Sequence, residues 1–293
     1  MRIAIVTTSW PGDEGDPCGH FVRAEARELE RGGHAVEVVA PRGGAFGWPG
    51  VAARLRERPL RAIDAARWVA AARARVRRLD VERVVAHWAV PCAWPVGLAA
   101  RGAELEIVSH GGDVRLLAGM PRVVRRRLVR ALAARSMCWR FVSQALQREL
   151  CDVLDPETRE AVARIAVVRA PSVEVPDVGE AVARRARELA GRRVAVSVGR
   201  LVRGKRVDRA IEHVARARDL DALVVVGDGP ERPRLEALAR ARGVDATFVG
   251  LVPREEALAW IGAAEVVLHA SQEEGLSTVL REAETLGTRV VVV

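Results

Sequence analysis

Two carboxylates near the C-terminal end of the chain, Glu274 and Glu282, stand eight positions apart with a glycine and polar residues between them. The apolar run 266–268 precedes them, so the pattern predicts a strand, a loop that carries Glu274, and a helix whose first turns carry Glu282. In a parallel α/β sheet this junction lies at the carboxyl end of a strand, where ligands bind. We expect the loop amides of residues 276–278 to face a phosphate at the helix N-terminus, while the carboxylates hold sugar and ribose hydroxyls. The segment therefore indicates a nucleotide-sugar site.

A second candidate segment, residues 199–205, contains the only lysine among 47 basic residues. A single Lys in an Arg-rich background suggests that a compact ammonium is required at that position, with chance retention as the alternative. The segment follows the apolar run 194–198, so it is also predicted to be a loop between a strand and a helix. Arg200 and Lys205 could then neutralise a diphosphate.

Length and composition predict a large α/β protein. The 293 residues suffice for two domains, and 49% of them are hydrophobic. Val-rich runs alternate with stretches rich in Ala, Arg and Leu, which is the pattern of parallel α/β folds. The chain has no Tyr and only 4% aromatic residues, which disfavours a protein that stacks nucleic-acid bases on aromatic side chains. A nicotinamide dehydrogenase is also disfavoured, because no G-x-G-x-x-G follows the first strand.

The net charge of +9 lies entirely in the first part of the sequence. Residues 1–170 hold 28 Arg and 19 acidic residues, whereas residues 171–293 hold 19 basic and 19 acidic residues. A basic half suggests an anionic partner, which could be a phospholipid surface, a lipid-phosphate acceptor or nucleic acid. Arg-rich helices that are simply solvated are the alternative explanation.

The helix expected after Pro121 combines an apolar stripe with several arginines. The stripe consists of Val123, Val124, Leu128 and Leu132. Such a helix can lie on an anionic membrane or pack as an ordinary surface helix on the sheet. No apolar run approaches the roughly 20 residues of a membrane span, and the four cysteines show no metal-ligand spacing. We therefore expect a cytoplasmic protein, soluble or peripheral on the inner face of the plasma membrane.

The strand and helix patterns predict two domains, residues 1–170 and 171–293, joined by a Pro-containing linker at 171–176. In the first domain they predict strands at 3–7, 35–40, 84–87, 105–109, 138–142 and 165–168, with helices at 21–31, 60–79 and 93–100 and after residues 121 and 143. In the second domain they predict helices at 178–190, 206–217, 231–242, 254–262 and 279–287, alternating with strands at 193–199, 222–227, 246–249, 265–268 and 289–293. The last strand would end the chain with an uncovered carboxylate, so we expect the natural polypeptide to continue.

Several segments, in order along almost the whole chain, together resemble the GT-B glycosyltransferases of glycosyltransferase family 4, the retaining E-x7-E group. They are the loop ending at Gly19 and residues 29–41, 110–113, 199–205, 226–230, 248–250 and 274–282. The resemblance implies an α/β fold of two Rossmann-like domains facing each other across a cleft. The first would be the acceptor-side domain and the second the nucleotide-sugar-binding domain. Family members continue beyond the final valines, so the second domain is expected to be incomplete here.

The resemblance also implies a role for each matching position. Catalytic roles fall to His110 and Glu274, and an acceptor-side role falls to Asp113. Donor binding falls to Gly19, Arg200, Lys205, Leu251, Val252, Gly275, Leu276, Ser277, Thr278 and Glu282. Arg200 and Lys205 would stabilise the leaving diphosphate, and Glu282 would hold the ribose. The implied reaction retains the anomeric configuration and needs no metal or other cofactor; the D-x-D at 219–221 is interpreted as a surface turn.

These assignments predict an enzyme that moves a sugar from a nucleotide-diphosphate sugar to a glycan, glycolipid or small-molecule hydroxyl, as in polysaccharide biosynthesis. The expected partners are the nucleotide sugar, a hydroxyl acceptor that could be lipid-linked, and an anionic membrane surface, with no nucleic acid. One alternative is an inactive or truncated GT-B protein that binds nucleotide or a partner without turnover. A GT-B nucleotide-sugar epimerase is a further alternative, disfavoured by the spacing of Glu274 and Glu282.

Overall fold

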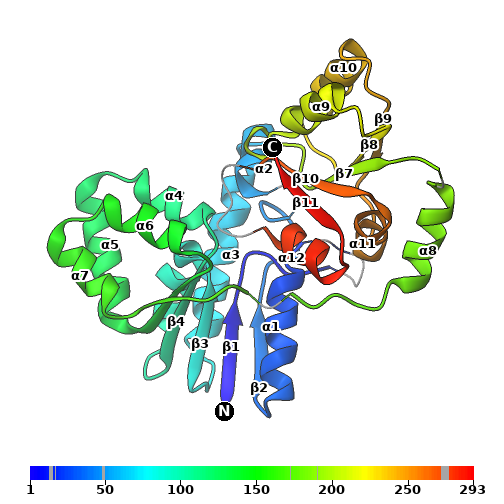
Figure 1. The fold of residues 1–293 in the computed structure, drawn as a ribbon. Coiled ribbons are helices and arrows are strands. Elements are labelled where there is room, and N and C mark those ends of the chain that lie inside the picture. Colours follow the sequence, from blue (N-terminus) through cyan, green and yellow to red (C-terminus); the bar gives the residue numbers. More distant parts are fainter. Residues whose placement is uncertain (13–15, 17, 48–49, 172, 190, 272–276) are drawn as a thin grey trace. The chain divides into compact units, whose positions relative to one another are not determined.

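A computed structural model describes the chain except for residues 13–15, 17, 48–49, 172, 190 and 272–276 (Figure 1). The chain forms two compact units. Unit 1 comprises Met1–Gly12 and Cys18–Ser172, and unit 2 comprises Val173–Val293. The boundary lies within the Pro-containing segment 171–176. Each unit is built around its own parallel sheet.

Unit 1 is a six-stranded sheet in the order β2-β1-β3-β4-β5-β6, and all its strand pairs are parallel. Its strands are β1 (Arg2–Val6), β2 (Ala35–Val39), β3 (Arg83–His87), β4 (Glu104–Ser109), β5 (Ser136–Phe141) and β6 (Ala166–Val168). Its helices and turns are α1 (His20–Arg31), α2 (Val51–Glu57), α3 (Arg61–Val76), η1 (Ala89–Val96), η2 (Gly97–Ala99), α4 (Gly112–Ala118), α5 (Arg122–Arg135), α6 (Gln144–Asp152) and α7 (Pro156–Ala163). The central strands carry fully buried side chains such as Ile3, Ile5 and Ile107, as expected for strands covered on both faces.

The helix predicted at 93–100 is only partly correct. The chain there forms the short 3-10 helix η2 and, before it, the kinked segment η1, in which Val90 and Trp94 have extended backbone angles. Each precedes a proline, Pro91 or Pro95, and the proline ring disfavours a helical conformation of the residue before it. Helices α2, α4 and α7 were not predicted from the sequence, although α7 has a regular start in which the Asp155 carboxylate accepts a hydrogen bond from Thr158 N at 3.2 Å.

The apolar stripe predicted for α5 is only partly correct. Leu128 and Leu132 are buried in unit 1, whereas Val123 and Val124 at the start of the helix are 61% and 51% exposed. The first turn of α5 therefore presents two valines to solvent, and only the later turns pack on the sheet.

Unit 2 is a five-stranded parallel sheet in the order β11-β10-β7-β8-β9. Its elements are α8 (Gly179–Glu188), β7 (Val194–Val198), η3 (Arg203–Lys205), α9 (Val207–Arg216), β8 (Ala222–Val226), α10 (Arg232–Ala241), β9 (Ala246–Gly250), α11 (Arg254–Ala263), β10 (Val266–His269), α12 (Thr278–Thr285) and β11 (Arg289–Val292). One hydrophobic core packs α9 and α10 against the sheet, and a second packs α8, α11 and α12 against the other face. The predicted α/β class is thus confirmed, and the strands and helices of unit 2 lie within two or three residues of their predicted bounds.

No helix in the described part of the chain is both long enough and apolar enough to span a bilayer.

Candidate functional site

The loops that follow β7, β8 and β9 are joined by backbone hydrogen bonds at the carboxyl end of the unit 2 sheet. Gly199 N donates to Val226 O at 2.9 Å, and Gly227 N donates to Gly250 O at 2.8 Å. A Cβ on Gly227 would lie 1.9 Å from Gly199 O, and Gly227 has a φ of +129°. Only glycine fits at this position. This close packing fixes the backbone from which Arg200 projects.

Lys205 lies in the η3 turn beside the same loops. The turn is connected to the end of β10 by the Ser271 hydroxyl, which donates to Gly204 O at 3.4 Å. Burial, and secondarily the Arg200 guanidinium, lower the pKa of Lys205 from 10.5 to about 7. Burial and then Lys205 itself lower the pKa of His269. Positive charge on Lys205 is thus disfavoured by Arg200, and positive charge on His269 is disfavoured by Lys205, at the carboxyl end of the sheet, which suits an anionic ligand.

The predicted phosphate-facing loop is described only in part. Glu274, Gly275 and Leu276 lie outside the described residues. Ser277 is the N-cap of α12, is buried, and makes no side-chain hydrogen bond that caps the helix. Thr278 opens the helix. The N-terminus of α12 follows β10, the strand that pairs with β7, so these two residues belong to the same end of the sheet as Lys205 and His269.

Glu282, the predicted ribose ligand, is a buried carboxylate with an ion-pair partner. Arg254 Nη2, at the start of α11, lies 3.0 Å from Glu282 Oε1, and the two side chains are 13% and 7% exposed. The same Nη2 donates to Glu174 O at 2.6 Å, in the segment that leads from unit 1 into unit 2. Arg254 therefore connects Glu282 to this linker. Arg254 could not be identified from the sequence, because nothing in a single Arg at a helix start signals a distant carboxylate.

We expect the variant Arg254→Met to lower the unfolding free energy of unit 2 by about 2–4 kcal/mol, because it removes the guanidinium that pairs with the buried Glu282 carboxylate. Hydrogen exchange of unit 2 amides in increasing urea measures the change. Adding Glu282→Gln to this variant removes the buried charge and should recover most of the loss. A single-variant effect below about 0.5 kcal/mol would contradict the structural importance of the pair.

Leu251 and Val252, the predicted base-contacting residues, form the turn between β9 and α11. Leu251 is 49% exposed, whereas Val252 packs partly on the core between the sheet and α11. They precede Arg254 by two or three residues, so the segment of the predicted base contacts also carries the ion-pair partner of Glu282, the predicted ribose ligand.

In unit 1, the loop after β4 is held by Asp113, which is 2% exposed. One carboxylate oxygen accepts hydrogen bonds from Ser109 Oγ at 2.7 Å and from Ala89 N at 2.8 Å. The other accepts from His110 N and Gly111 N, both at 3.2 Å. Both carboxylate oxygens therefore accept hydrogen bonds from unit 1 itself, and Asp113 fixes the loop that carries His110.

The His110 ring lies at the end of β4 among three other rings. Its centroid is 4.8 Å from those of Phe21 and Trp88, and its Nε2 is 3.0 Å from Nδ1 of the fully buried His87. Burial, then the neighbouring His87, lower the pKa of His110 well below 6.5. His110 is therefore a neutral, oriented imidazole at neutral pH, suited to hydrogen bonding with a polar ligand.

Gly19, the predicted phosphate-approach residue, caps α1 with a φ of +70°. A Cβ at this position would lie 2.4 Å from Ser9 O. The loop after β1 approaches the start of α1 so closely that packing within unit 1 by itself requires glycine at position 19.

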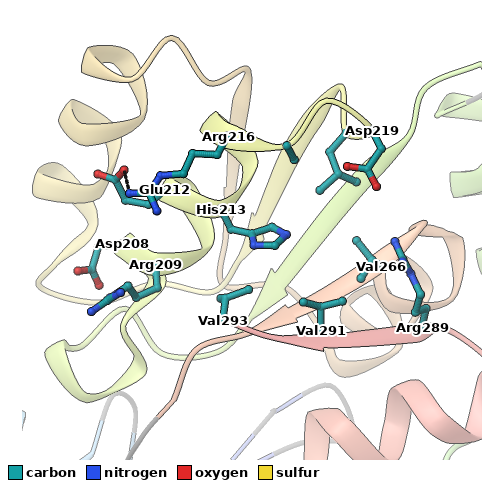
Figure 2. A pocket seen from close by; sticks show the side chains of 12 residues that line it. Asp208, Arg209, Glu212, His213, Arg216, Asp219, Val266, Arg289, Val291 and Val293 are labelled. Atoms are coloured by element: carbon teal, nitrogen blue, oxygen red, sulfur yellow. Dashed lines mark hydrogen bonds and ion pairs between the residues drawn. The ribbon is translucent and has the colours of Figure 1, made fainter.

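A groove of about 690 Å³ lies elsewhere in unit 2, between α9 and the β10–β11 edge of the sheet (Figure 2). His213 projects into it from α9, and Val266, Val291 and Val293 line its apolar side. Its lining includes Asp219 of the D-x-D but none of the predicted site residues. Asp221 of the same motif pairs with Arg193 at 3.1 Å, which gives this carboxylate a structural partner.

Comparison with known proteins finds a family match within the second unit. Residues 181–293 match the family described as "Glycosyl transferases group 1". Over 217 residues the chain is 27% identical to the "Putative teichuronic acid biosynthesis glycosyltransferase TuaC" of Bacillus subtilis (strain 168), covering 73% of this chain and 54% of that protein. Over 101 residues it is 37% identical to the alpha-D-kanosaminyltransferase of Streptomyces kanamyceticus, covering 32% and 26%. The chain thus spans about half the length of the first relative and a quarter of the second.

Solved structures resemble the chain over nearly its whole length. Anabaena HepE in complex with UDP and glucose has a TM-score of 0.68 at 18% identity, covering 100% of this chain and 80% of that one. The sucrose-phosphate synthase of Thermosynechococcus elongatus has a TM-score of 0.71 at 19% identity, covering 99% and 80%. The chain therefore has the two-unit α/β fold of GT-B glycosyltransferases, and its second unit matches the glycosyl transferases group 1 family over residues 181–293.

Proposed function

We propose that the chain is a retaining glycosyltransferase of the family 4 type, which moves a sugar from a nucleotide-diphosphate sugar to a hydroxyl of a glycan, glycolipid or small molecule. The donor diphosphate would occupy the carboxyl end of the unit 2 sheet. The observation that carries this proposal is the mostly buried Lys205 beside Arg200, whose low pKa marks a site that a bound anion would stabilise. The match of residues 181–293 to a glycosyltransferase family supports it.

In the proposed reaction, Arg200 and Lys205 stabilise the negative charge that develops on the departing diphosphate. The acceptor hydroxyl attacks the anomeric carbon from the face that the diphosphate leaves, and a phosphate oxygen takes its proton. Glu274 orients hydroxyls of the transferred sugar, and Glu282 orients the ribose diol. His110 contributes a hydrogen bond to the sugar. The proposal assigns no metal to the reaction, so transfer is expected to persist in EDTA.

Thermal unfolding with UDP, GDP and ADP tests the donor-site proposal. A nucleoside diphosphate at 100 times its dissociation constant should stabilise the protein by roughly 2.7 kcal/mol. We expect one of the three to raise the midpoint clearly, and its base to be the donor base. No shift with any of them, in a protein that unfolds cooperatively, would contradict the proposal.

The acceptor side of the proposal includes a peripheral position at an anionic membrane, with a lipid-linked acceptor. Its support is the first turn of α5, where Val123 and Val124 are exposed beside Arg122 and Arg127. Three other arginines of this helix, Arg125, Arg126 and Arg130, are already engaged. Arg125 donates to carbonyl oxygens of unit 1, and Arg126 and Arg130 both pair with Glu157.

We expect the protein to pellet with phosphatidylglycerol vesicles at low salt, and the double variant Val123→Glu, Val124→Glu to pellet several-fold less because it removes the apolar contact and adds negative charge. Phosphatidylcholine vesicles serve as the control for the electrostatic part. Absence of the wild-type protein from the anionic vesicle pellet would overturn the membrane position and leave the donor-site proposal unaffected.

A GT-B protein that binds nucleotide without turnover is the second candidate function. The two functions differ in one measurement: both predict nucleotide binding, but only the transferase releases nucleoside diphosphate from a bound nucleotide sugar.

A further inference from the structure

A cluster of charged and titratable side chains is buried in unit 1 directly behind His110. The Arg140 guanidinium, on β5, pairs with the Glu25 carboxylate of α1 and lies 3.2 Å from Glu106 Oε1 of β4. The Arg140, Glu25 and Glu106 side chains are only 4%, 10% and 13% exposed. His87, at the end of β3, is fully buried between this cluster and His110. The two histidines thus continue a charged network outward from the core.

The two imidazole rings meet edge to edge. His87 Nδ1 and His110 Nε2 are 3.0 Å apart, the ring centroids are 5.2 Å apart, and the ring planes are within 14° of each other. If the two nitrogens meet in the plane of the rings, the centroid separation should equal the nitrogen–nitrogen distance plus the distance of each nitrogen from its own ring centre. The observed separation is close to that sum, so the contact lies nearly in the ring planes. That is the geometry of an N–H···N hydrogen bond, in which one nitrogen carries the proton and the other a lone pair.

The position of the Glu25 carboxylate determines which ring nitrogen of His87 carries the proton. His87 Nε2 is buried and faces Glu25 Oε2 at 3.7 Å. A lone pair on this nitrogen would point at a carboxylate, whereas an N–H is attracted to it. Burial, and secondarily Arg140, lower the pKa of His87 to about 3, so the ring is neutral and carries one N–H. With the proton on Nε2, His87 Nδ1 must accept, and His110 Nε2 must donate.

We propose that His87 is a positioning residue that fixes His110 as the Nε2–H tautomer, so that His110 presents the lone pair of Nδ1 to a hydroxyl of the transferred sugar. The tautomer follows from the geometry of unit 1 alone, and only its use toward a sugar rests on the proposed function. Within the described residues, His110 Nδ1 has no hydrogen-bond partner, while Phe21 and Trp88 hold the ring in place. In this proposal His110 Nδ1 is a hydrogen-bond acceptor for the ligand. It therefore favours a hydrogen-bond donor such as a hydroxyl over a carbonyl or phosphate oxygen.

Nitrogen-15 NMR of the histidine rings tests this directly, because the chain has only six histidines. In the full-length protein labelled with ¹⁵N-histidine at pH 7.5, long-range proton–nitrogen correlations report the tautomer of each ring. The spin system lost in His110→Gln identifies His110, and His34→Gln is the control for a histidine outside the cluster. We expect His110 to be at least 90% Nε2–H in the wild-type protein.

Two substitutions of His87 separate positioning from simple packing. His87→Leu removes the acceptor, so the His110 ring should become a mixture of both tautomers. His87→Asn places an amide oxygen near the position of Nδ1 and should restore the Nε2–H form. An Nδ1–H tautomer in the wild-type protein, or an unchanged tautomer in folded His87→Leu, would overturn the inference. Failure of the proposed function would appear differently, as a wild-type protein that binds none of UDP, GDP and ADP while its His110 tautomer is as expected.

Discussion

Lys205→Met is expected to abolish stabilisation by nucleoside diphosphates and, at the same time, to make the free protein more stable. The ammonium is a direct ligand of the diphosphate in our account, so its loss should remove the nucleotide-dependent shift of roughly 2.7 kcal/mol at 100 times the wild-type dissociation constant. The free protein gains because it no longer buries a cation beside Arg200. A residue that lowers stability and is needed for binding is typical of a functional site.

The pH dependence of this gain has a defined sign. Folding lowers the pKa of Lys205 from 10.5 to about 7, so protonation favours the unfolded chain. The loss of folding stability caused by protonated Lys205 is fully present below about pH 7. It disappears as pH rises through the window between about 7 and 10.4. The excess stability of Lys205→Met over wild type should therefore be on the order of a few kcal/mol below pH 7 and shrink above it.

Arg203→Met is the matched control, because Arg203 lies in the same turn with a side chain that is 94% exposed. It should change neither the free stability nor the nucleotide shift appreciably. Retention of a full nucleotide shift in Lys205→Met would contradict the assignment of Lys205 to the diphosphate.

Arg140→Met is expected to be the most destabilising single substitution that we predict, lowering the unfolding free energy of unit 1 by about 3–5 kcal/mol. The reason is that it leaves Glu25 and Glu106 buried without the cation between them. Urea denaturation followed by tryptophan fluorescence measures the change, since six of the seven tryptophans lie in unit 1.

Two further variants test the cause of that loss. Arg130→Met removes an exposed pair with Glu157 and should cost less than about 1 kcal/mol. The triple variant Arg140→Met, Glu25→Gln, Glu106→Gln removes all three charges and should recover a substantial part of the loss. Equal effects of Arg140→Met and Arg130→Met would show that the buried network contributes no more than a surface pair.

The secondary structure of unit 2 could be predicted because local signals and tertiary packing agree there. The strands from β7 to β11 are short and mainly apolar, all the helices except α11 are amphipathic, and glycines mark several of the turns. The segment after β3 was mispredicted because its apolar composition favoured a helix, whereas Pro91 and Pro95 determined the backbone. The exposure of Val123 and Val124 was missed because a stripe does not show where a helix leaves the surface of its sheet.

The candidate site could be predicted as a set of loops at strand ends, but not as a set of contacts. Lys205 was identified by its rarity, and its burial beside Arg200 became evident only from the fold. The pairing of His87 with His110 joins residues 23 positions apart, and that of Arg254 with Glu282 joins residues 28 positions apart. Such pairs depend on which strands are neighbours in the sheet, and no local pattern encodes that order.

The central claim is that a nucleoside diphosphate binds against Lys205, and proton uptake measured by calorimetry tests it most directly. The titration uses whichever of UDP, GDP and ADP stabilises the protein most, at pH 8 in two buffers of different ionisation enthalpy, in a His269→Asn background that removes the neighbouring titratable ring. If binding raises the pKa of Lys205 from about 7 to above 9, the complex should take up about 0.8–0.9 proton at pH 8, and Lys205→Met should abolish the uptake. Binding without proton uptake would show that the diphosphate does not contact this ammonium and would contradict the account.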